Sequence, residues 1–176
     1  MSVGQWRTAI GKAIIPVERR WLKNTATKIE AEFEEPVIVN IGIFRGATMY
    51  CLRAGSPKAI LYGIDTEYPQ GAKLHASARA DVIISDSGTY HKKFRGQIHF
   101  LFVDGDHSYE GVKADIAGWT PKIATGGIVA FHDFKTAPAV ARKHAGIRKA
   151  ILEWEQRTTS WEQIEAPGSL RAYRRL

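Results

Sequence analysis

The chain has 176 residues, of which 44% are apolar, and its 25 lysines and arginines outnumber 18 aspartates and glutamates to give a formal net charge of +7. This length favours a single domain over residues 1–176, with enough apolar sequence for a core. No run of apolar residues is long enough to cross a membrane, the N-terminus lacks the apolar stretch of a signal peptide, and the lone Cys51 excludes an intrachain disulfide. We therefore expect a cytoplasmic protein without a membrane partner.

The predicted elements begin with helices and then alternate between strands and helices. Helical patterns cover residues 6–15 and 17–34, separated by Pro16 and stopped by Pro36. Short apolar runs rich in β-branched or aromatic residues predict strands at residues 37–41, 59–64, 81–85, 98–103 and 127–131, the last of them after a Gly126-Gly127 turn. Helices are predicted at residues 47–54, 70–79, 88–95 (a short helix or a loop), 108–118 and 138–155. Two alternating segments around Pro167-Gly168 predict a hairpin.

A strand–helix alternation repeated five times predicts a doubly wound, mostly parallel α/β sheet. Continuous apolar strands fit burial on both faces of such a sheet. We divide the chain into N-terminal helices at residues 1–35, a core at 36–134, and a C-terminal helix with an antiparallel hairpin at 135–176. The N-terminal helices are expected to pack on the sheet or to cover the site.

Ligands of such sheets bind at the carboxyl ends of the strands, so the residues after each strand are the candidates. The first strand runs into the turn Asn40–Thr48, in which Gly42 and Gly46 allow a ligand close to the backbone. The second strand is followed by Asp65, placed to accept the hydroxyls of a ribose, and the third by Ser85, Asp86 and Ser87, which could bond a base edge. A turn or a helix cap explains each residue alone. Their succession favours a nucleoside ligand without a pyrophosphate, because the dinucleotide glycine pattern is absent.

Ionisable residues concentrate after the fourth and fifth strands. Asp104, Asp106 and His107 follow the fourth strand, and His132-Asp133 follows the fifth. Two carboxylates and an imidazole at neighbouring strand ends can hold a divalent cation; oxygen ligands suit Mg²⁺ or Mn²⁺, and a histidine shifts the preference towards Mn²⁺ or another transition metal. For Asp106 we expect the cap of the following helix, and for His132 an ordinary polar contact explains the residue as well as a metal does.

The stretches "FVDGDHSYEGVKADI" at residues 102–116 and "GGIVAFHD" at residues 126–133 resemble a known family. The chain is similar to class I S-adenosylmethionine-dependent methyltransferases, and most like small-molecule O-methyltransferases, including those of sugars, that carry a strand-end DGDHSYEGV signature. The resemblance covers residues 37–134, with a weaker match in the tail. It implies the Rossmann-like methyltransferase fold and S-adenosylmethionine as the cofactor.

The resemblance also implies roles by position. The Asn40–Thr48 turn would hold the methionine part of the cofactor, Asp65 the ribose, and Asp86 and Ser87 the adenine. In this assignment the cofactor-binding residues are Asn40, Gly42, Phe44, Gly46, Thr48, Asp65, Asp86, Ser87 and Asp104. Asp104, His132 and Asp133 would bind Mg²⁺ or Mn²⁺, and His107 would be the general base, with Asp104 beside it.

Two positions depart from the family. Asn40 stands where relatives usually carry an acid for the ammonium group of the cofactor. His132 stands where many metal-dependent relatives carry a carboxylate or an amide.

The sequence therefore predicts an S-adenosylmethionine-dependent O-methyltransferase that acts on a hydroxyl group of a small molecule, with a sugar as one candidate. The basic charge keeps open a methyltransferase acting on nucleic acid or its cap, although the charge is scattered apart from the C-terminal Arg171, Arg174 and Arg175. Asn40 keeps open a non-catalytic module that only binds the cofactor or a partner. A homo-oligomer also stays open. We expect His75, His91, His99 and His144 to be surface or loop residues.

Overall fold

The computed structural model describes residues 14–67, 79–135, 142 and 144–176. Its centre is a seven-stranded sheet in the order β3-β2-β1-β4-β5-β7-β6. Strands β1 to β5 are parallel, whereas β7 pairs antiparallel with both β5 and β6. The strands are β1 (Val37–Ile41), β2 (Ile60–Asp65), β3 (Asp81–Ile84), β4 (Ile98–Val103), β5 (Ile123–Phe131), β6 (Trp161–Ile164) and β7 (Arg171–Arg175). The predicted doubly wound sheet with a C-terminal antiparallel hairpin is confirmed.

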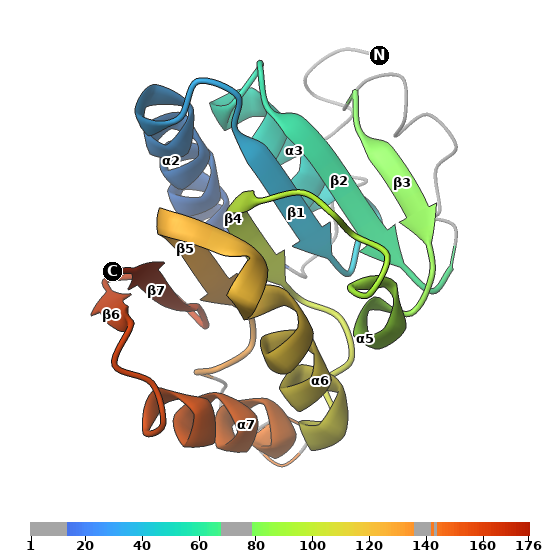
Figure 1. Ribbon diagram of the computed structural model, residues 1–176, viewed down its shortest axis with the longest axis vertical. Helices are drawn as coiled ribbons and strands as arrows, with labels where there is room; N and C mark the ends of the chain where they lie inside the picture. The colour runs from blue at the N-terminus through green and yellow to red at the C-terminus, as the bar shows by residue number, and fades with distance from the viewer. Residues whose placement is uncertain (1–13, 68–78, 136–141, 143) are drawn as a thin grey trace.

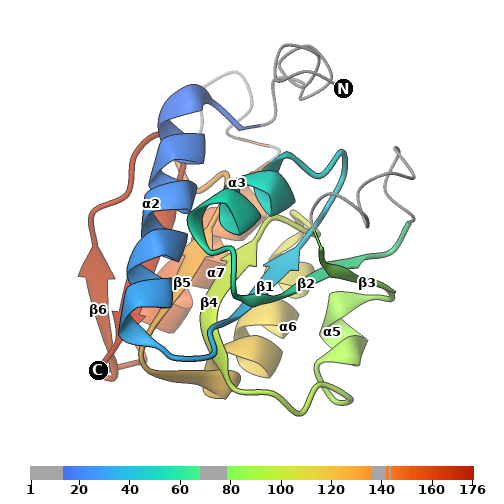
Figure 2. The ribbon, with the colours of Figure 1, turned by 90° about the horizontal axis from the view of Figure 1, so that it is seen from above.

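Helices cover both faces of this sheet (Figures 1 and 2). Helices α2 and α3 lie together on one face, and α5, α6 and α7 lie on the other. The helices are α2 (Pro16–Glu32), α3 (Ala47–Gly55), α5 (Ser87–Tyr90), α6 (Tyr109–Trp119) and α7 (Ala145–Glu155), with a 3₁₀ turn at Thr120–Lys122. The result is a three-layer α/β/α arrangement.

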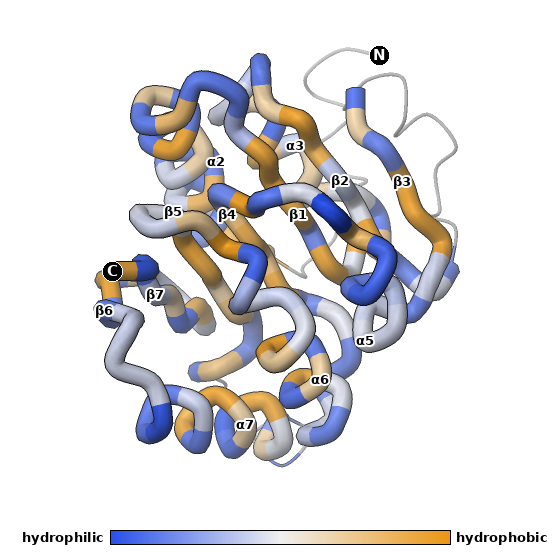
Figure 3. Tube along the Cα trace, viewed as in Figure 1, coloured by the Kyte–Doolittle hydropathy of each residue, from blue (hydrophilic) through white to orange (hydrophobic). Residues whose placement is uncertain are grey.

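The two apolar layers arise because successive side chains of a strand point to opposite faces. In β4, Phe100 and Phe102 pack in the layer of α2 and α3, whereas Leu101 and Val103 pack in the layer of α6 and α7. These four side chains are at most 5% exposed. Figure 3 shows the same distribution, with apolar residues along the central strands and hydrophilic residues in many of the loops.

Most predicted elements agree with the structure to within a few residues, with three differences. Strand β5 starts at Ile123 rather than at residue 127, and Gly126 lies inside it with a φ of 82°. The predicted turn there is an irregularity within the strand, because only the register between β4 and β5 shifts. Helix α5 ends at Tyr90, so most of the 88–95 segment is a loop. Helix α7 begins at Ala145, after the expected start at residue 138, and residues 136–141 and 143 lie outside the described residues. Most residues of the helices predicted at 6–15 and 70–79 also lie outside them; residues 14, 15 and 79, which are described, are not helical.

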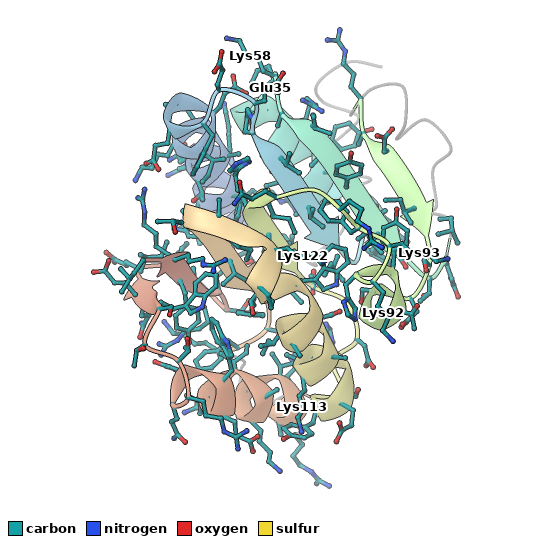
Figure 4. The ribbon with its side chains drawn as sticks, viewed as in Figure 1. Glu35, Lys58, Lys92, Lys93, Lys113 and Lys122 are labelled. Atoms are coloured by element: carbon teal, nitrogen blue, oxygen red, sulfur yellow. The ribbon has the colours of Figure 1, made fainter. Side chains whose placement is uncertain are left out.

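The C-terminal arginines are held by other parts of the fold. Arg171 contacts both carboxylate oxygens of Glu155 at 2.7 and 2.8 Å, Arg174 pairs with Glu32 at 2.5 Å, and Arg175 donates to the carbonyl of Ile123. Other basic side chains are dispersed: Lys58 and Lys113 lie at opposite ends of the molecule in Figure 4. Among the described helices, none combines the length and apolar character that crossing a membrane requires.

Candidate functional site

The order of the sheet reverses between β1 and β4, and the carboxyl ends of these two strands touch there. The Gly42 amide donates to Ile64 O at 2.8 Å, and the Asp104 amide donates to Ile41 O at 2.9 Å. Gly42 has a φ of 82°, and a Cβ added to it would lie 1.9 Å from Asp104 O. Only glycine fits this position, because both the backbone angle and the space exclude a side chain.

The turn after β1 is fastened to the end of β2. Asp65 Oδ2 accepts from the amides of Ile43 and Phe44 at 2.7 and 3.0 Å, and Oδ1 accepts from the Glu67 amide at 3.2 Å. Phe44 adopts a φ of 48° and is 59% exposed, and Gly46 caps α3 with a φ of 77°. Asp65 thus shapes the turn; a carboxylate has acceptor capacity beyond these bonds, and its ribose role stays a prediction.

Asn40 and Thr48 lie at the two ends of this turn. Asn40 is fully buried, and its Nδ2 donates to Gly42 O at 2.9 Å. Among the described residues, no donor reaches Asn40 Oδ1, although this atom is buried. A buried acceptor without a partner is unusual and fits a donor such as an ammonium group. Thr48 is 4% exposed in the first turn of α3.

Asp86 and Ser87 follow β3 at the same edge of the sheet as Asp65. The Ser85 amide donates to Asp65 O at 2.8 Å, which joins the ends of β2 and β3. Asp86 precedes α5 in an extended conformation, and Ser87 O accepts from Trp119 Nε1 at 3.1 Å. The predicted cofactor residues therefore share one edge, and their individual contacts with a cofactor stay predictions.

The ionisable residues after β4 and β5 converge beside the Gly42 turn. His132 Nδ1 lies 3.2 Å from Asp104 Oδ1 and 3.5 Å from Asp133 Oδ1, and His107 Nε2 lies 3.4 Å from Asp104 Oδ1. Asp104, His107 and His132 line a pocket whose other walls include Val112, Phe131 and Ile147. Asp133 has a φ of 57°, an uncommon backbone angle for a residue with a side chain and one that often marks functional sites.

Two residues that the sequence did not single out complete this cluster. Glu18 of α2 is 2% exposed, and its Oε2 lies 3.5 Å from His132 Nε2. His144, expected to be a surface or loop residue, lies in the turn before α7 with its side chain 11% exposed, and its Nδ1 lies 3.7 Å from Asp133 Oδ2. The loop position is confirmed, but the side chain is mostly buried because α7, which His144 immediately precedes, packs against α6 beside the site. The sequence did contain a signal for Glu18, because it is a charged residue on the face of α2 that otherwise carries buried residues such as Leu22 and Ala26.

The surroundings of His132 favour positive charge. Burial by itself would lower the pKa of His132, but Asp104, Asp133 and Glu18 outweigh it and raise the pKa to about 12. Burial would likewise raise the pKa of Glu18, yet His132 and donors from Ser169 and Ile15 lower it to about 2. Three carboxylates thus surround one imidazole, and the cluster has an excess of negative charge.

Asp104, His132 and Asp133 also fit a divalent cation. Their ligand atoms all lie within 4.8 Å of one another. Both ring nitrogens of His132 are buried, and neither makes a hydrogen bond of normal geometry among the described residues. Nδ1 therefore faces two carboxylates across a space where a cation would satisfy all three groups, with Nε2 directed to Glu18.

Residues 39–134 match a family model described as "Methyltransferase domain". The chain belongs to this methyltransferase family. The expectation of a class I, S-adenosylmethionine-dependent methyltransferase is confirmed. Glu18, His144 and Ser169 all lie outside the matched segment. Residues on both sides of this segment therefore contribute to the cluster around His132 and Asp133.

Solved structures resemble the methyltransferase over most of its length. A protein of Corynebacterium glutamicum is 17% identical with a TM-score of 0.77, covering 98% of this chain and 86% of its own. The O-methyltransferase NovP is 14% identical with a TM-score of 0.69, covering 89% and 79%. The mycinamycin-pathway methyltransferase MycE, in complex with Mg and S-adenosylhomocysteine, is 13% identical with a TM-score of 0.63, covering 93% and 55%. At these identities the likeness establishes the fold.

Proposed function

We propose that this methyltransferase is an O-methyltransferase that transfers the methyl group of S-adenosylmethionine to a hydroxyl of a small molecule, with a sugar as the leading candidate. The observation that best supports this proposal is the position of His107. It lies beside the carboxylates of Asp104 and Asp133, next to the edge of the sheet that carries the Gly42 turn. A hydroxyl is a poor nucleophile until a base removes its proton, and an imidazole is suited to that task near neutral pH.

In this proposal His107 accepts the proton of the acceptor hydroxyl. Asp104 Oδ1 at 3.4 Å and Asp133 Oδ2 at 3.7 Å then stabilise the imidazolium that forms. The side chain of His107 is 31% exposed, which leaves access for an acceptor. The Asn40–Thr48 turn, Asp65, Asp86 and Ser87 would hold the cofactor, with Asn40 Oδ1 as the acceptor for its ammonium group.

Asp104, His132 and Asp133 would hold Mg²⁺ or Mn²⁺, which when bound supplies a Lewis acid that lowers the pKa of a hydroxyl. The imidazole ligand favours Mn²⁺. Similarity to MycE, whose structure contains Mg, and to the O-methyltransferase NovP supports both the cation and the O-methyl acceptor.

Nucleic acid is the weaker acceptor candidate. The clustered arginines that would serve it, Arg171, Arg174 and Arg175, are engaged with Glu155, Glu32 and backbone carbonyls. Solved relatives include an rRNA methylase from Streptococcus thermophilus, so oligonucleotides belong in the acceptor screen. Binding to them should be strongly salt-dependent if it is functional.

The test is methyl transfer from labelled cofactor to a panel of sugars and other hydroxyl compounds. His107→Ala should lower transfer by about 10²-fold or more, the usual contribution of a general base, while cofactor affinity stays within a few-fold. His91→Ala, at a histidine that packs on Trp119, is the matched control. Unchanged transfer in His107→Ala would exclude this base, and unchanged transfer in EDTA would exclude the cation. Cofactor binding without transfer to any acceptor would favour a non-catalytic module.

A further inference from the structure

Asp133 faces a second set of ligand atoms with its other oxygen. Its Oδ1 lies towards His132, whereas Oδ2 lies 3.7 Å from His107 Nε2 and 3.7 Å from His144 Nδ1. The ligand atoms of His107, Asp133 and His144 all lie within 4.8 Å of one another. The Asp133 carboxylate therefore belongs to two groups of candidate metal ligands. One group adds Asp104 and His132, and the other adds the two imidazoles of His107 and His144.

The position of His144 is fixed by close packing. It precedes α7, and a Cβ added to Gly146 in the first turn of that helix would lie 2.6 Å from the Tyr109 amide and 3.1 Å from His107 O. This contact places the His144 ring 5.0 Å from the His107 ring, edge to face. The start of α7 thus lies directly on the loop that carries His107.

The imidazole of His144 also has an unmet bonding requirement. Its Nδ1 is buried, and among the described residues none forms a hydrogen bond with it. A buried polar atom of this kind destabilises the fold unless a partner satisfies it. Asp133 Oδ2, at 3.7 Å, is too distant for that bond, but an ion between the two atoms would satisfy both.

We propose that His107, Asp133 and His144 form a zinc site. Zinc takes nitrogen and oxygen ligands tetrahedrally at 2.0–2.1 Å, which separates the ligand atoms by about 3.4 Å. The two 3.7 Å separations to Asp133 Oδ2 need only small side-chain movements to reach that value. Two imidazoles and one carboxylate select Zn²⁺ over Mg²⁺, because Mg²⁺ prefers oxygen ligands. The fourth position would be left to water.

Zinc at this site has a consequence that rests on the proposed function. The ion occupies Nε2 of His107, so the imidazole cannot serve as a base while zinc is bound. Zn²⁺ therefore inhibits methyl transfer, whereas Mg²⁺ or Mn²⁺ at Asp104, His132 and Asp133 does not. Asp133 is shared by both sites, so each ion influences the affinity of the other.

The experiment is a calorimetric titration of chelator-treated protein with Zn²⁺ in saturating Mn²⁺. We compare wild type with His144→Ala, with His91→Ala as a matched histidine control, and with Asp104→Asn, which changes a ligand of the other site and keeps all three proposed zinc ligands. His144→Ala should weaken Zn²⁺ binding by about 100-fold or more, while His91→Ala leaves it unchanged and Asp104→Asn retains it. Long-range ¹⁵N NMR of the wild type should show the His144 Nδ1 resonance move when Zn²⁺ is added, which requires no variant to fold.

Equal Zn²⁺ affinity in His144→Ala and His91→Ala would refute the proposed zinc site. A His144 Nδ1 resonance that does not move when Zn²⁺ is added would also refute it. Loss of Zn²⁺ binding in Asp104→Asn with retention in His144→Ala would assign the zinc to the other group and overturn it as well. A wild type that binds Zn²⁺ through His144 but methylates no acceptor would support the site and refute the proposed activity.

Discussion

Removing the carboxylate of Glu18 should destabilise the fold more than removing any comparable surface carboxylate. Glu18 Oε1 accepts from the Ser169 amide at 2.8 Å and the Ser169 hydroxyl at 2.9 Å, and Oε2 accepts from the Ile15 amide at 3.0 Å. Oε2 also faces His132 Nε2 at 3.5 Å. Glu18→Ala would leave these groups and the buried imidazole without their anionic partner.

Two estimates of the cost agree. Breaking a buried ion pair by removing one partner costs about 3–5 kcal/mol. A pKa lowered from 4.5 to about 2 corresponds to roughly 3 kcal/mol, at about 1.36 kcal/mol per pKa unit. Because the folded-state pKa is depressed, this stabilisation is present above pH 4.5 and is lost as pH falls towards 2.

The assay is urea unfolding in a chelating buffer, followed by circular dichroism. Glu30 on the same helix provides a matched control, because its carboxylate accepts from a serine hydroxyl and a backbone amide but, within the part of the chain that the structure describes, contacts no histidine. We expect Glu18→Ala to lose about 3–5 kcal/mol at pH 7 and Glu30→Ala to lose about 1 kcal/mol or less. Equal losses in the two variants, or a Glu18 effect as large near pH 2 as at pH 7, would show that the ionised Glu18 carboxylate does not supply this stabilisation.

Two further predictions follow from buried or crowded positions. Burial raises the pKa of Asp115 to about 6 from 3.8, so the folded state binds the extra proton and its stability falls as pH rises between these values. Asp115→Asn should therefore stabilise the protein by up to about 3 kcal/mol at pH 8 and by little at pH 3.5, as measured by unfolding at both pH values; an equal gain at both would contradict this assignment. Gly42→Ala should cost about 2–5 kcal/mol and abolish cofactor binding, because its Cβ would meet Asp104 O at 1.9 Å. A Cβ at Gly88 would meet Ala114 Cβ at 3.3 Å and Asp86 Oδ1 at 3.4 Å, so Gly88→Ala should leave cofactor binding within a few-fold of wild type. Cofactor binding retained in Gly42→Ala would show that the turn is not the cofactor site.

The sheet was predictable because its strands are bounded by strong local signals. The bounds predicted for β1 and β4 are those observed, since each is a short, mostly apolar run with clear ends: Pro36 and Gly42 flank β1, and Gln97 and Asp104 flank β4. The start of β5 was predicted four residues late because Gly126-Gly127 has the composition of a turn. A glycine with a positive φ can also sit inside an irregular strand, and only the pairing with β4 distinguishes the two.

The candidate site was predictable where its residues directly follow strands. Asp104, His107, His132 and Asp133 come together because parallel strands end at the same edge. Glu18 and His144 could not be placed this way, because helix packing and not strand order brings them to the site. The helix cap predicted at Asp106 was wrong: Ser108 caps α6, and Asp106 accepts from the amide and hydroxyl of Ser108.

The most direct test of the account is calorimetric titration of the purified protein with S-adenosylmethionine, with and without Mg²⁺ or Mn²⁺. We predict cofactor binding at about micromolar concentration, lost in Gly42→Ala, and a separate metal-dependent heat that Asp104→Asn removes. The absence of binding at millimolar cofactor, with or without metal, would contradict the assignment of the Asn40–Thr48 turn and with it the proposed methyl transfer.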